Sequence, residues 1–239
     1  MTSPKPIATR NHTGWTSNQL NEVSELFVDF CSGVALPVLD IGAAYGIATH
    51  AALATGATVI ANDAEATHLQ ILFEHTAEAD RKRLVQVPGR FPRHLQFGEG
   101  SLGAVHASNV FHFLTGPQLG QGAASIAHWL AVGGKVFVQA STPWQGPFAG
   151  FIGEFEDRRA KGDAFPGWIA DAHERFDHPK ISQIPSAIHL LDDQTLSRVF
   201  LAAGMEIERC WLYRRRDLAK GMQFDGRECC GLIAVKQGA

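Results

Sequence analysis

The sequence predicts an α/β protein built on a doubly wound, mostly parallel sheet. Between about residues 20 and 140, short apolar segments alternate with segments whose apolar residues recur every three or four positions. The first pattern is typical of buried strands and the second of helices that pack on a sheet. Strict alternation of this kind favours parallel strands joined by right-handed helical crossovers. A chain of 239 residues, 45% of them hydrophobic, fits one such domain with an added element.

The individual elements follow from periodicity and from the residues that end each segment. Gly56 and Gly204 are natural helix stops, Pro117 suits the first turn of a helix, and Gly133 and Gly134 form a turn. The last two strands have no helix between them, so we expect an antiparallel hairpin at one sheet edge. The expected helices are 19–31, 46–55, 66–78, 117–130 and 193–203, and the expected strands are 37–41, 58–62, 84–87, 103–107, 135–139, 205–213 and 228–235.

The chain is predicted to form a single domain, 1–239, with four parts. Residues 1–35 form an N-terminal arm, flexible over 1–17, and a helix, and residues 36–142 form a cofactor-binding core. Residues 143–190 interrupt the alternation with a helical insertion, and residues 191–239 form the last helix and hairpin. An insertion at this point lies over the carboxyl ends of the strands, where open α/β sheets bind ligands. We interpret it as a substrate lid; the alternative is a helix that covers the sheet edge without touching a ligand.

A small-residue loop follows the first strand, and a carboxylate ends each of the first two strands. The run Asp40-Ile41-Gly42-Ala43-Ala44-Tyr45-Gly46 follows apolar residues 36–39, and Asp63 ends the next strand. Glycines let a ligand lie against bare backbone, and the following helix points free N–H groups at it. A carboxylate at the end of the second strand is placed to accept hydrogen bonds from ribose hydroxyls. The two features predict a nucleoside-containing cofactor; an ordinary tight turn is the alternative for the loop alone.

The loop does not have the Gly-x-Gly-x-x-Gly spacing of dinucleotide-binding proteins. Asp40 would repel a pyrophosphate but suits a ligand that carries an ammonium or sulfonium group. Residues 38–46 resemble the first motif of the class I S-adenosylmethionine-dependent methyltransferases, and Asp63 matches the ribose-binding acid of that family. The resemblance covers about the first two-thirds of the chain and returns at 192–236. It implies a Rossmann-like, seven-stranded sheet with an antiparallel C-terminal hairpin, and S-adenosyl-L-methionine as the cofactor.

The chain departs from the family at two places. Ala44 stands where the family usually has glycine, and no acid follows the third strand near the adenine position. Adenine recognition would then depend on backbone groups around Arg90 and on an apolar face such as Phe91, while Asn109 follows the fourth strand beside the expected methyl position. The predicted cofactor-binding residues are Asp40, Gly42, Ala43, Ala44, Tyr45, Gly46, Asp63, Arg90, Phe91 and Asn109.

Methyl transfer from a sulfonium is an in-line displacement that depends mainly on orientation. Few catalytic side chains are therefore expected. His112, just after the fourth strand, is the candidate base, with a packing or capping role as the alternative. Aromatic and histidine side chains that could wall the acceptor site, or simply seal a core, are Trp15, Trp144, Phe151, Trp168 and His173.

Composition argues against several other classes of protein. A net charge of −3 offers no broad nucleic-acid footprint, and Arg214–Arg216 is read as a solvated strand end. The uncharged run 41–62 is too rich in Gly, Ala and Thr for a membrane span, and residues 1–10 do not read as a signal peptide. Four scattered cysteines predict neither a metal site nor a disulfide framework, and reduced thiols indicate the cytoplasm.

We therefore expect an S-adenosylmethionine-dependent methyltransferase that acts on a small or medium organic acceptor, with no metal, nucleic acid or membrane as partner. Two alternatives stay open. One is a protein or RNA methyltransferase, which predicts an open, charged groove. The other is a non-catalytic binding module on the same fold, kept open by Ala44 and by the missing acid after the third strand.

Overall fold

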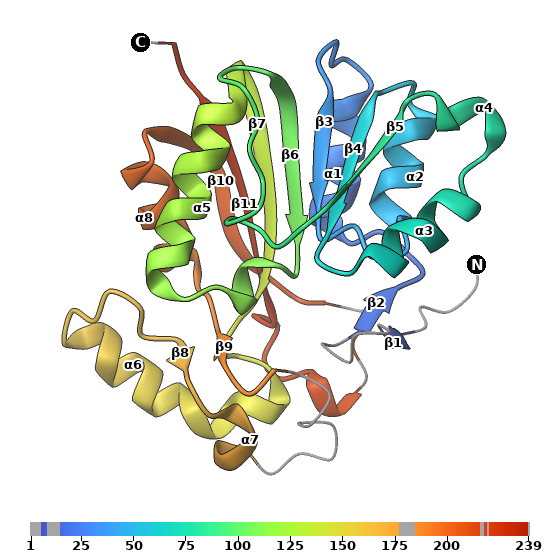
Figure 1. The fold of residues 1–239 in the computed structure, drawn as a ribbon. Coiled ribbons are helices and arrows are strands. Elements are labelled where there is room, and N and C mark those ends of the chain that lie inside the picture. The colour runs from blue at the N-terminus through green and yellow to red at the C-terminus, as the bar shows by residue number, and fades with distance from the viewer. Residues whose placement is uncertain (1–5, 9–14, 177–184, 216–217, 219, 239) are drawn as a thin grey trace.

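The structure is a computed structural model, which describes residues 6–8, 15–176, 185–215, 218 and 220–238. Its centre is a seven-stranded sheet in the order β10-β11-β7-β6-β3-β4-β5 (Figure 1). The five strands from β7 to β5 are parallel to one another, and β11 is antiparallel to both of its neighbours. The prediction of a doubly wound, mostly parallel sheet with an antiparallel C-terminal hairpin is confirmed. The strands are β3 (Val38–Ile41), β4 (Val59–Asp63), β5 (Leu84–Pro88), β6 (Leu102–Ser108), β7 (Leu130–Ser141), β10 (Met205–Tyr213) and β11 (Cys229–Lys236).

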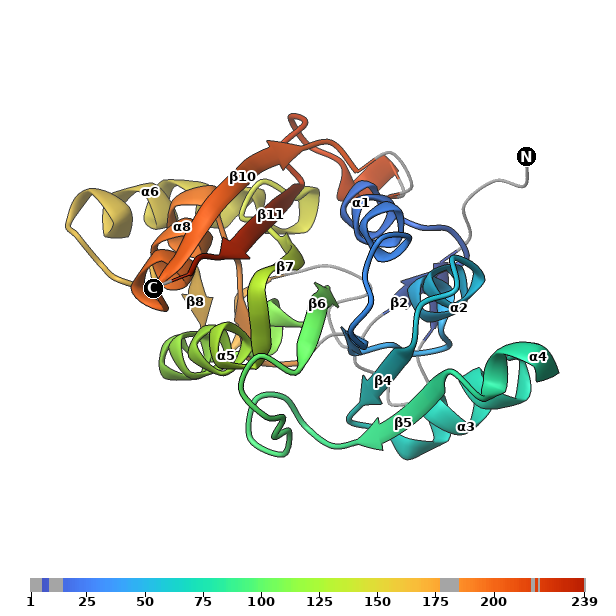
Figure 2. The ribbon, with the colours of Figure 1, turned by 90° about the horizontal axis from the view of Figure 1, so that it is seen from above.

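Helices cover both faces of the sheet (Figure 2). One buried cluster joins α1, α2 and α3 to the sheet, and a second cluster joins α5 and α8 to the other face. Consecutive residues of a strand point to opposite faces of the sheet and so belong to different clusters. Val38 belongs to the first cluster and Leu39 to the second. The helices are α1 (Glu22–Cys31), α2 (Ile47–Ala54), α3 (Ala66–Glu74), α4 (Glu78–Arg81), α5 (Gly116–Trp129) and α8 (Asp193–Ala202), and η1 (Phe111–Phe113) is a 3₁₀ turn.

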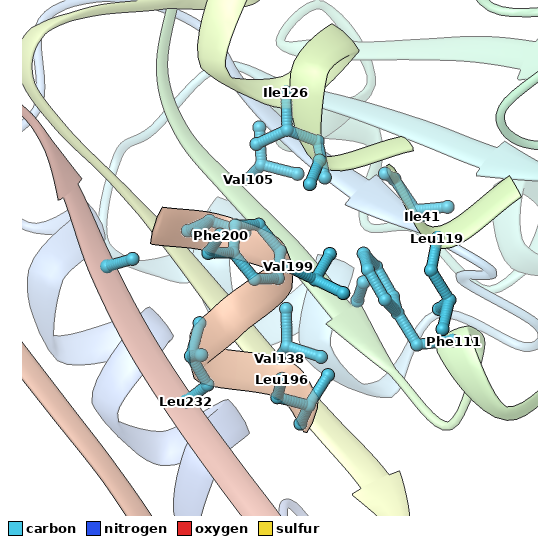
Figure 3. Packing of buried hydrophobic residues seen from close by; sticks show 14 of the residues in the cluster. Ile41, Val105, Phe111, Leu119, Ile126, Val138, Leu196, Val199, Phe200 and Leu232 are labelled. Atoms are coloured by element: carbon cyan, nitrogen blue, oxygen red, sulfur yellow. The ribbon is translucent and has the colours of Figure 1, made fainter. Parts of the chain in front are cut away.

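The core between α8 and the sheet shows how the second cluster is built (Figure 3). Leu196, Val199 and Phe200 of α8 lie against Val138 of β7 and Leu232 of β11. Their three- and four-residue spacing puts them on one side of the helix. The next residue, Leu201, points away from this core and is 57% exposed.

Three boundaries differ from the sequence-based expectation. Helix α3 ends at Glu74 rather than near residue 78. Just after its end, the buried Thr76 hydroxyl donates to the Leu72 carbonyl, and α4 then starts as a separate helix. Strand β7 begins already at Leu130, so the turn expected at 131–134 lies within it. The N-terminal arm, expected to be flexible, contains a short antiparallel ribbon of β1 (Pro6–Ala8) and β2 (Trp15–Ser17).

The insertion has a hydrophobic core of its own. It contains η2 (Gly146–Phe151), α6 (Ile152–Ala160), β8 (Trp168–Ile169), α7 (Ala172–Arg175) and β9 (Ile188–His189). Nine buried side chains, including Phe148, Phe155 and Phe176, form a cluster separate from the two sheet cores. The insertion lies at the carboxyl ends of the parallel strands (Figure 1), and where it ends, the Leu191 N–H donates to the Ser141 carbonyl at the end of β7. Within the described ranges, none of the helices has the length and apolar character needed to cross a membrane.

Replacing Phe200 with alanine should destabilise the protein strongly because it empties a fully buried position. We expect a loss of about 3–5 kcal/mol in the free energy of unfolding, measured by urea denaturation. Leu201→Ala, one residue further along the same helix, is the matched control and should change stability by about 0.5 kcal/mol or less. Equal losses in the two variants would contradict this assignment of the core face.

Candidate functional site

The loop between β3 and α2 is shaped by left-handed backbone at alternate residues. Gly42, Ala44 and Gly46 have φ values of 70°, 46° and 85°. Glycine adopts such angles freely and alanine at a cost, so Ala44 stands at a position whose backbone favours glycine. The Ala43 N–H donates to the Asn62 carbonyl over 2.8 Å, so the loop is tied to the end of β4. The small residues predicted from the sequence are thus required by backbone geometry.

Asp63 fixes the same loop from the end of β4. Its Oδ2 accepts a hydrogen bond from the Ala44 N–H over 2.9 Å. Its Oδ1 accepts from the Glu65 N–H over 2.9 Å and lies 3.2 Å from Nδ1 of His68. A carboxylate offers about four lone-pair positions, so one on Oδ2 stays available for a further donor. The Nε2 atom of His68, which is 1% exposed, has no hydrogen-bond partner among the described residues.

Asp40 is buried and held by two donors from neighbouring elements. Its side chain is 3% exposed. Thr49 of α2 donates to Oδ2 over 2.6 Å, and Nδ1 of His106, on the adjacent strand β6, lies 2.7 Å from Oδ1. The other ring nitrogen of His106 lies 3.0 Å from the Ser24 hydroxyl of α1. The carboxylate therefore links β3 to α2, β6 and α1.

Ser24, His106 and Asp40 have the connectivity of a hydrolytic triad, yet they do not form an active centre. All three residues are at most 3% exposed, and the Phe27 ring stacks on His106 with 4.7 Å between centroids. A nucleophile must be reachable by its substrate. We conclude that this array is a structural hydrogen-bond relay beneath the loop.

The end of β5 departs from the expected adenine site in one respect. Phe91 belongs to the core: its ring packs on Phe111 and Trp129, and a Cβ added at Gly122 would lie 2.7 Å from its Cζ. The prediction that Phe91 offers a face to adenine is therefore corrected. Arg90 is exposed. The end of β5 is joined to β4 by a side chain that the sequence did not single out, since the Asn62 amide donates to the Val87 and Gly89 carbonyls over 2.8 and 2.9 Å.

A polar network surrounds Asn109 at the end of β6. Asn109 has a φ of 59°, an uncommon value outside glycine that asparagine tolerates best. Its Oδ1 accepts from the buried amide of Gln139 over 3.2 Å, and Gln139 also accepts from the Tyr213 hydroxyl. Asn21, the N-cap of α1, donates to the Ser108 hydroxyl over 2.9 Å. The predicted Asn109 position is thus connected by hydrogen bonds to both α1 and β10.

His112 is buried in η1, the 3₁₀ turn that begins shortly after Asn109 in the chain. Burial, assisted by the Arg215 guanidinium, lowers the pKa of His112 to about 3. Its Nδ1 has no partner within the described ranges. A base works best when its pKa lies near the working pH, so the structure argues against His112 as a proton acceptor at neutral pH.

His189, which the sequence did not single out, lies beside η1. Its Nδ1–H donates to the Leu114 carbonyl over 3.0 Å and so joins the insertion to the segment after β6. Burial lowers its pKa to about 4, against the opposing effect of this hydrogen bond. The ring meets the edges of Phe165 and Trp168, each with 5.6 Å between centroids. Through His189, Trp168 is thereby connected to Leu114 in the segment after β6.

The predicted acceptor residues separate into different environments. Trp144 and Phe151 are 1% and 0% exposed within the insertion core, so the prediction that they line an acceptor site is corrected to a packing role. Trp168 is half-buried and, with Arg158, Ile169, Asp171, Glu174 and Arg175, lines a depression of about 430 Å³ on the insertion. His173 is exposed on α7. The side chain of Trp15 lies outside the described part of the chain.

The residues that sequence reasoning missed are mostly polar side chains inside apolar segments. His106 lies in the middle of the apolar strand β6, and His68 lies on the buried side of α3. A polar residue in such a place must find a partner, and that requirement was the available signal. Among the described residues, no cluster of three or more His, Cys, Asp or Glu side chains is arranged to hold a metal ion.

Comparisons with known proteins point to methyltransferases. Residues 38–134 match the family model described as a methyltransferase domain. The match spans the sheet from β3 into β7 and is consistent with the class I S-adenosylmethionine-dependent methyltransferase family. The protein is a methyltransferase, and its cofactor is S-adenosyl-L-methionine. A search of curated proteins finds no match to the chain.

Solved structures share the fold of this methyltransferase at low sequence identity. A Methanosarcina mazei S-adenosylmethionine-dependent methyltransferase has a TM-score of 0.66 and 11% identity, with 92% of this chain and 100% of the other covered. A Mesorhizobium loti enzyme of the same description has a TM-score of 0.61 and 16% identity, with coverage of 90% and 98%. A geranyl diphosphate methyltransferase in complex with its diphosphate ligand and sinefungin has a TM-score of 0.61 and 11% identity, with coverage of 89% and 77%.

The site of this methyltransferase fits its cofactor in two observable ways. Helix α2 begins at Gly46 without a side-chain cap, so its first N–H groups are not satisfied by a capping side chain. Beside Asp63, the buried Nε2 of His68 lacks a partner among the described residues, so this end of the site has a polar atom in need of one. Both features suit a nucleoside that carries hydroxyl and carboxylate groups.

The two buried histidines should make the methyltransferase sensitive to mild acid. An unfolded histidine has a pKa near 6.5, so between that pH and about 4 the unfolded chain binds more protons than the folded chain. Stability should fall as the pH falls through this window, by up to about 1.4 kcal/mol per pH unit for each histidine.

This pH dependence can be measured by urea unfolding at pH 7, 6 and 5. His189→Asn keeps a donor near the Leu114 carbonyl and should remove about half of the histidine contribution to the slope. His75→Gln, which changes an exposed histidine at the end of α3, is the control and should leave the slope unchanged. A slope that His189→Asn does not alter would contradict the pKa direction given for His189.

Proposed function

We propose that this methyltransferase acts on a small or medium organic acceptor and holds its cofactor between the ends of β3, β4, β5 and β6. The observation that carries the proposal is the 2.9 Å contact between Asp63 Oδ2 and the Ala44 N–H. It brings the acid at the end of β4 and the side-chain-poor loop after β3 to one place. A cofactor with a ribose and a charged amino-acid end needs both features together.

Each proposed cofactor residue has a role that its surroundings support. Asp63 accepts from the ribose hydroxyls with the lone pair that its protein partners leave available. Gly42, Ala43, Ala44, Tyr45 and Gly46 give close backbone approach, and Tyr45 packs its ring edge to face with His68, 5.1 Å between centroids. Asp40 contributes negative charge beneath the loop, Arg90 offers its backbone near adenine, and Asn109 stands next to the reacting end. When bound, S-adenosylmethionine supplies an electrophilic methyl group on a sulfonium.

The acceptor side is proposed to work by orientation rather than by proton removal. His112 and His189 are neutral at pH 7 because burial lowers the pKa of each. They can hold a group by hydrogen bonding but are poor bases. The acceptor atom must then be nucleophilic without their help, and the chain supplies position and exclusion of water, effects that are worth about 7–11 kcal/mol in favourable cases.

A small acceptor is supported by what covers the carboxyl ends of the strands. The insertion has its own core and is fixed beside the ends of β6 and β7 through the Leu191–Ser141 and His189–Leu114 hydrogen bonds, which favours an acceptor small enough to fit next to it. Trp168 and the exposed His173 of the insertion are the remaining candidates for acceptor contacts. The geranyl diphosphate methyltransferase, which has the same fold and was solved with its small diphosphate ligand, supports the proposal.

Asp63→Asn should weaken the binding of S-adenosylmethionine because it removes a charged acceptor of ribose hydrogen bonds. We expect a loss of about 10–100-fold in affinity, measured by isothermal titration calorimetry. Asp157→Asn, which removes an exposed carboxylate on α6, is the control and should bind as wild type does. Unchanged affinity in Asp63→Asn would rule out the proposed pocket, and absence of binding by the wild type would favour a non-catalytic binding module.

The acceptor class can be tested with cofactor labelled in its methyl group. The full chain is incubated with fractionated cell extract, and the label is followed after ultrafiltration. We expect the label in the small-molecule fraction. Label retained with protein or RNA would overturn the proposed acceptor class and leave the cofactor site untouched.

A further inference from the structure

We propose that His106 and Ser24 are positioning residues for the cofactor: they hold the Asp40 carboxylate in place beneath the loop, so that the site prefers a cationic ligand over its neutral counterpart. The inference deepens the proposed function and rests on the cofactor lying at the 42–46 loop. It assigns a role to a relay that spans Thr49, Asp40, His106 and Ser24 and that no catalytic step requires.

The hydrogen-bond directions in the relay follow from the atoms involved. The Asp40 carboxylate can only accept, so Thr49 donates to Oδ2 and the Nδ1–H of His106 donates to Oδ1, over 2.6 and 2.7 Å. With its proton on Nδ1, a neutral His106 presents a lone pair on Nε2, to which the Ser24 hydroxyl donates over 3.0 Å. In this arrangement every polar atom of His106 is satisfied, and the relay as a whole carries one negative charge.

That charge is well insulated from solvent. Asp40 and His106 are each 2% exposed, and the Phe27 ring stacks on the imidazole. A charge in a poorly solvated place acts over a longer distance than one in water. Asp40 lies two residues before Gly42 on β3, and its Oδ2 is held by Thr49 of α2, so its charge lies between the two elements that the loop joins. A sulfonium at the loop is attracted by it, whereas the thioether left after methyl transfer is neutral at sulfur.

The relay also explains why α1 is fastened to the site. Ser24 reaches His106, and Asn21, one turn earlier, reaches Ser108 two residues further along the same strand. Both contacts come from the first turn of α1, where the Ser24 N–H is itself held by the Asn21 side chain over 3.0 Å. Helix α1 therefore orients His106 through Ser24, and it holds the network around Asn109 through the contact between Asn21 and Ser108.

The test compares three ligands by calorimetry on the full chain: S-adenosylmethionine, sinefungin and S-adenosylhomocysteine. The first two carry a positive charge near the transferred methyl position, and the third does not. Asp40→Asn keeps the shape and both neighbours of the side chain but removes its charge. We expect it to weaken binding of the two cationic ligands by about tenfold relative to S-adenosylhomocysteine.

Variants of His106 separate positioning from simple packing. His106→Asn places an amide donor near Nδ1 and should keep the preference for cationic ligands. His106→Gln moves the amide towards Ser24 and leaves Oδ1 of Asp40 without a donor, so the preference should fall as it does in Asp40→Asn. Ser24→Ala removes the contact that orients the ring and should lower the preference about threefold. Asp80→Asn, which removes a partly exposed carboxylate paired with Arg83, matches the change in net charge and should keep the preference.

The melting temperature of each variant shows that it is folded before it is titrated. Equal weakening of all three ligands in Asp40→Asn would overturn the inference, because a merely structural role does not distinguish a sulfonium from a thioether. Should His106→Gln fail to fold, Ser24→Ala decides the matter, because an unchanged preference in that variant would overturn the positioning role. If the wild type binds none of the ligands, the proposed function fails. If the wild type binds them without preference, only the present inference fails.

Discussion

A buried carboxylate that must be hydrogen-bonded organises this end of the molecule. An ionised group removed from water is costly unless donors replace the solvent, and Asp40 obtains its donors from α2 and β6. The donor on β6 is a histidine, which needs a second partner and finds it on α1. One side chain thus sets the position of three elements around the start of the loop. The geometry at the start of the loop follows from satisfying that charge.

The second acid completes the arrangement from the neighbouring strand. Parallel pairing places Ile41 beside Asn62, so the residues that end β3 and β4 necessarily lie next to each other. Asp63 then accepts from the loop N–H of Ala44, and the Asn62 side chain reaches the end of β5. The loop is held on both sides by protein groups. A site preorganised in this way has less conformational entropy to lose when it binds a ligand.

Much of this could be predicted from the sequence because the relevant signals are local. The apolar run ending in Asp40, the small residues to Gly46 and the apolar run ending in Asp63 are contiguous stretches whose spacing reflects one βαβ unit. What failed depended on contacts distant in sequence. Phe91 and Trp144 are aromatic residues whose exposure is decided by α5 and by the insertion core, and His189 reaches Leu114 across 75 residues. No periodicity within a segment carries that information.

The insertion explains why the acceptor side is harder to infer than the cofactor side. Its large aromatics serve its own core, since a segment of this length must bury apolar surface to remain folded against the sheet. The two histidines at its junction with η1, His112 and His189, are buried and therefore neutral at pH 7. A site furnished with neutral hydrogen-bonding groups selects by shape and orientation. Such selection suits a reaction whose electrophile is already activated by its own positive charge, because the protein then has only to align the acceptor and keep water out.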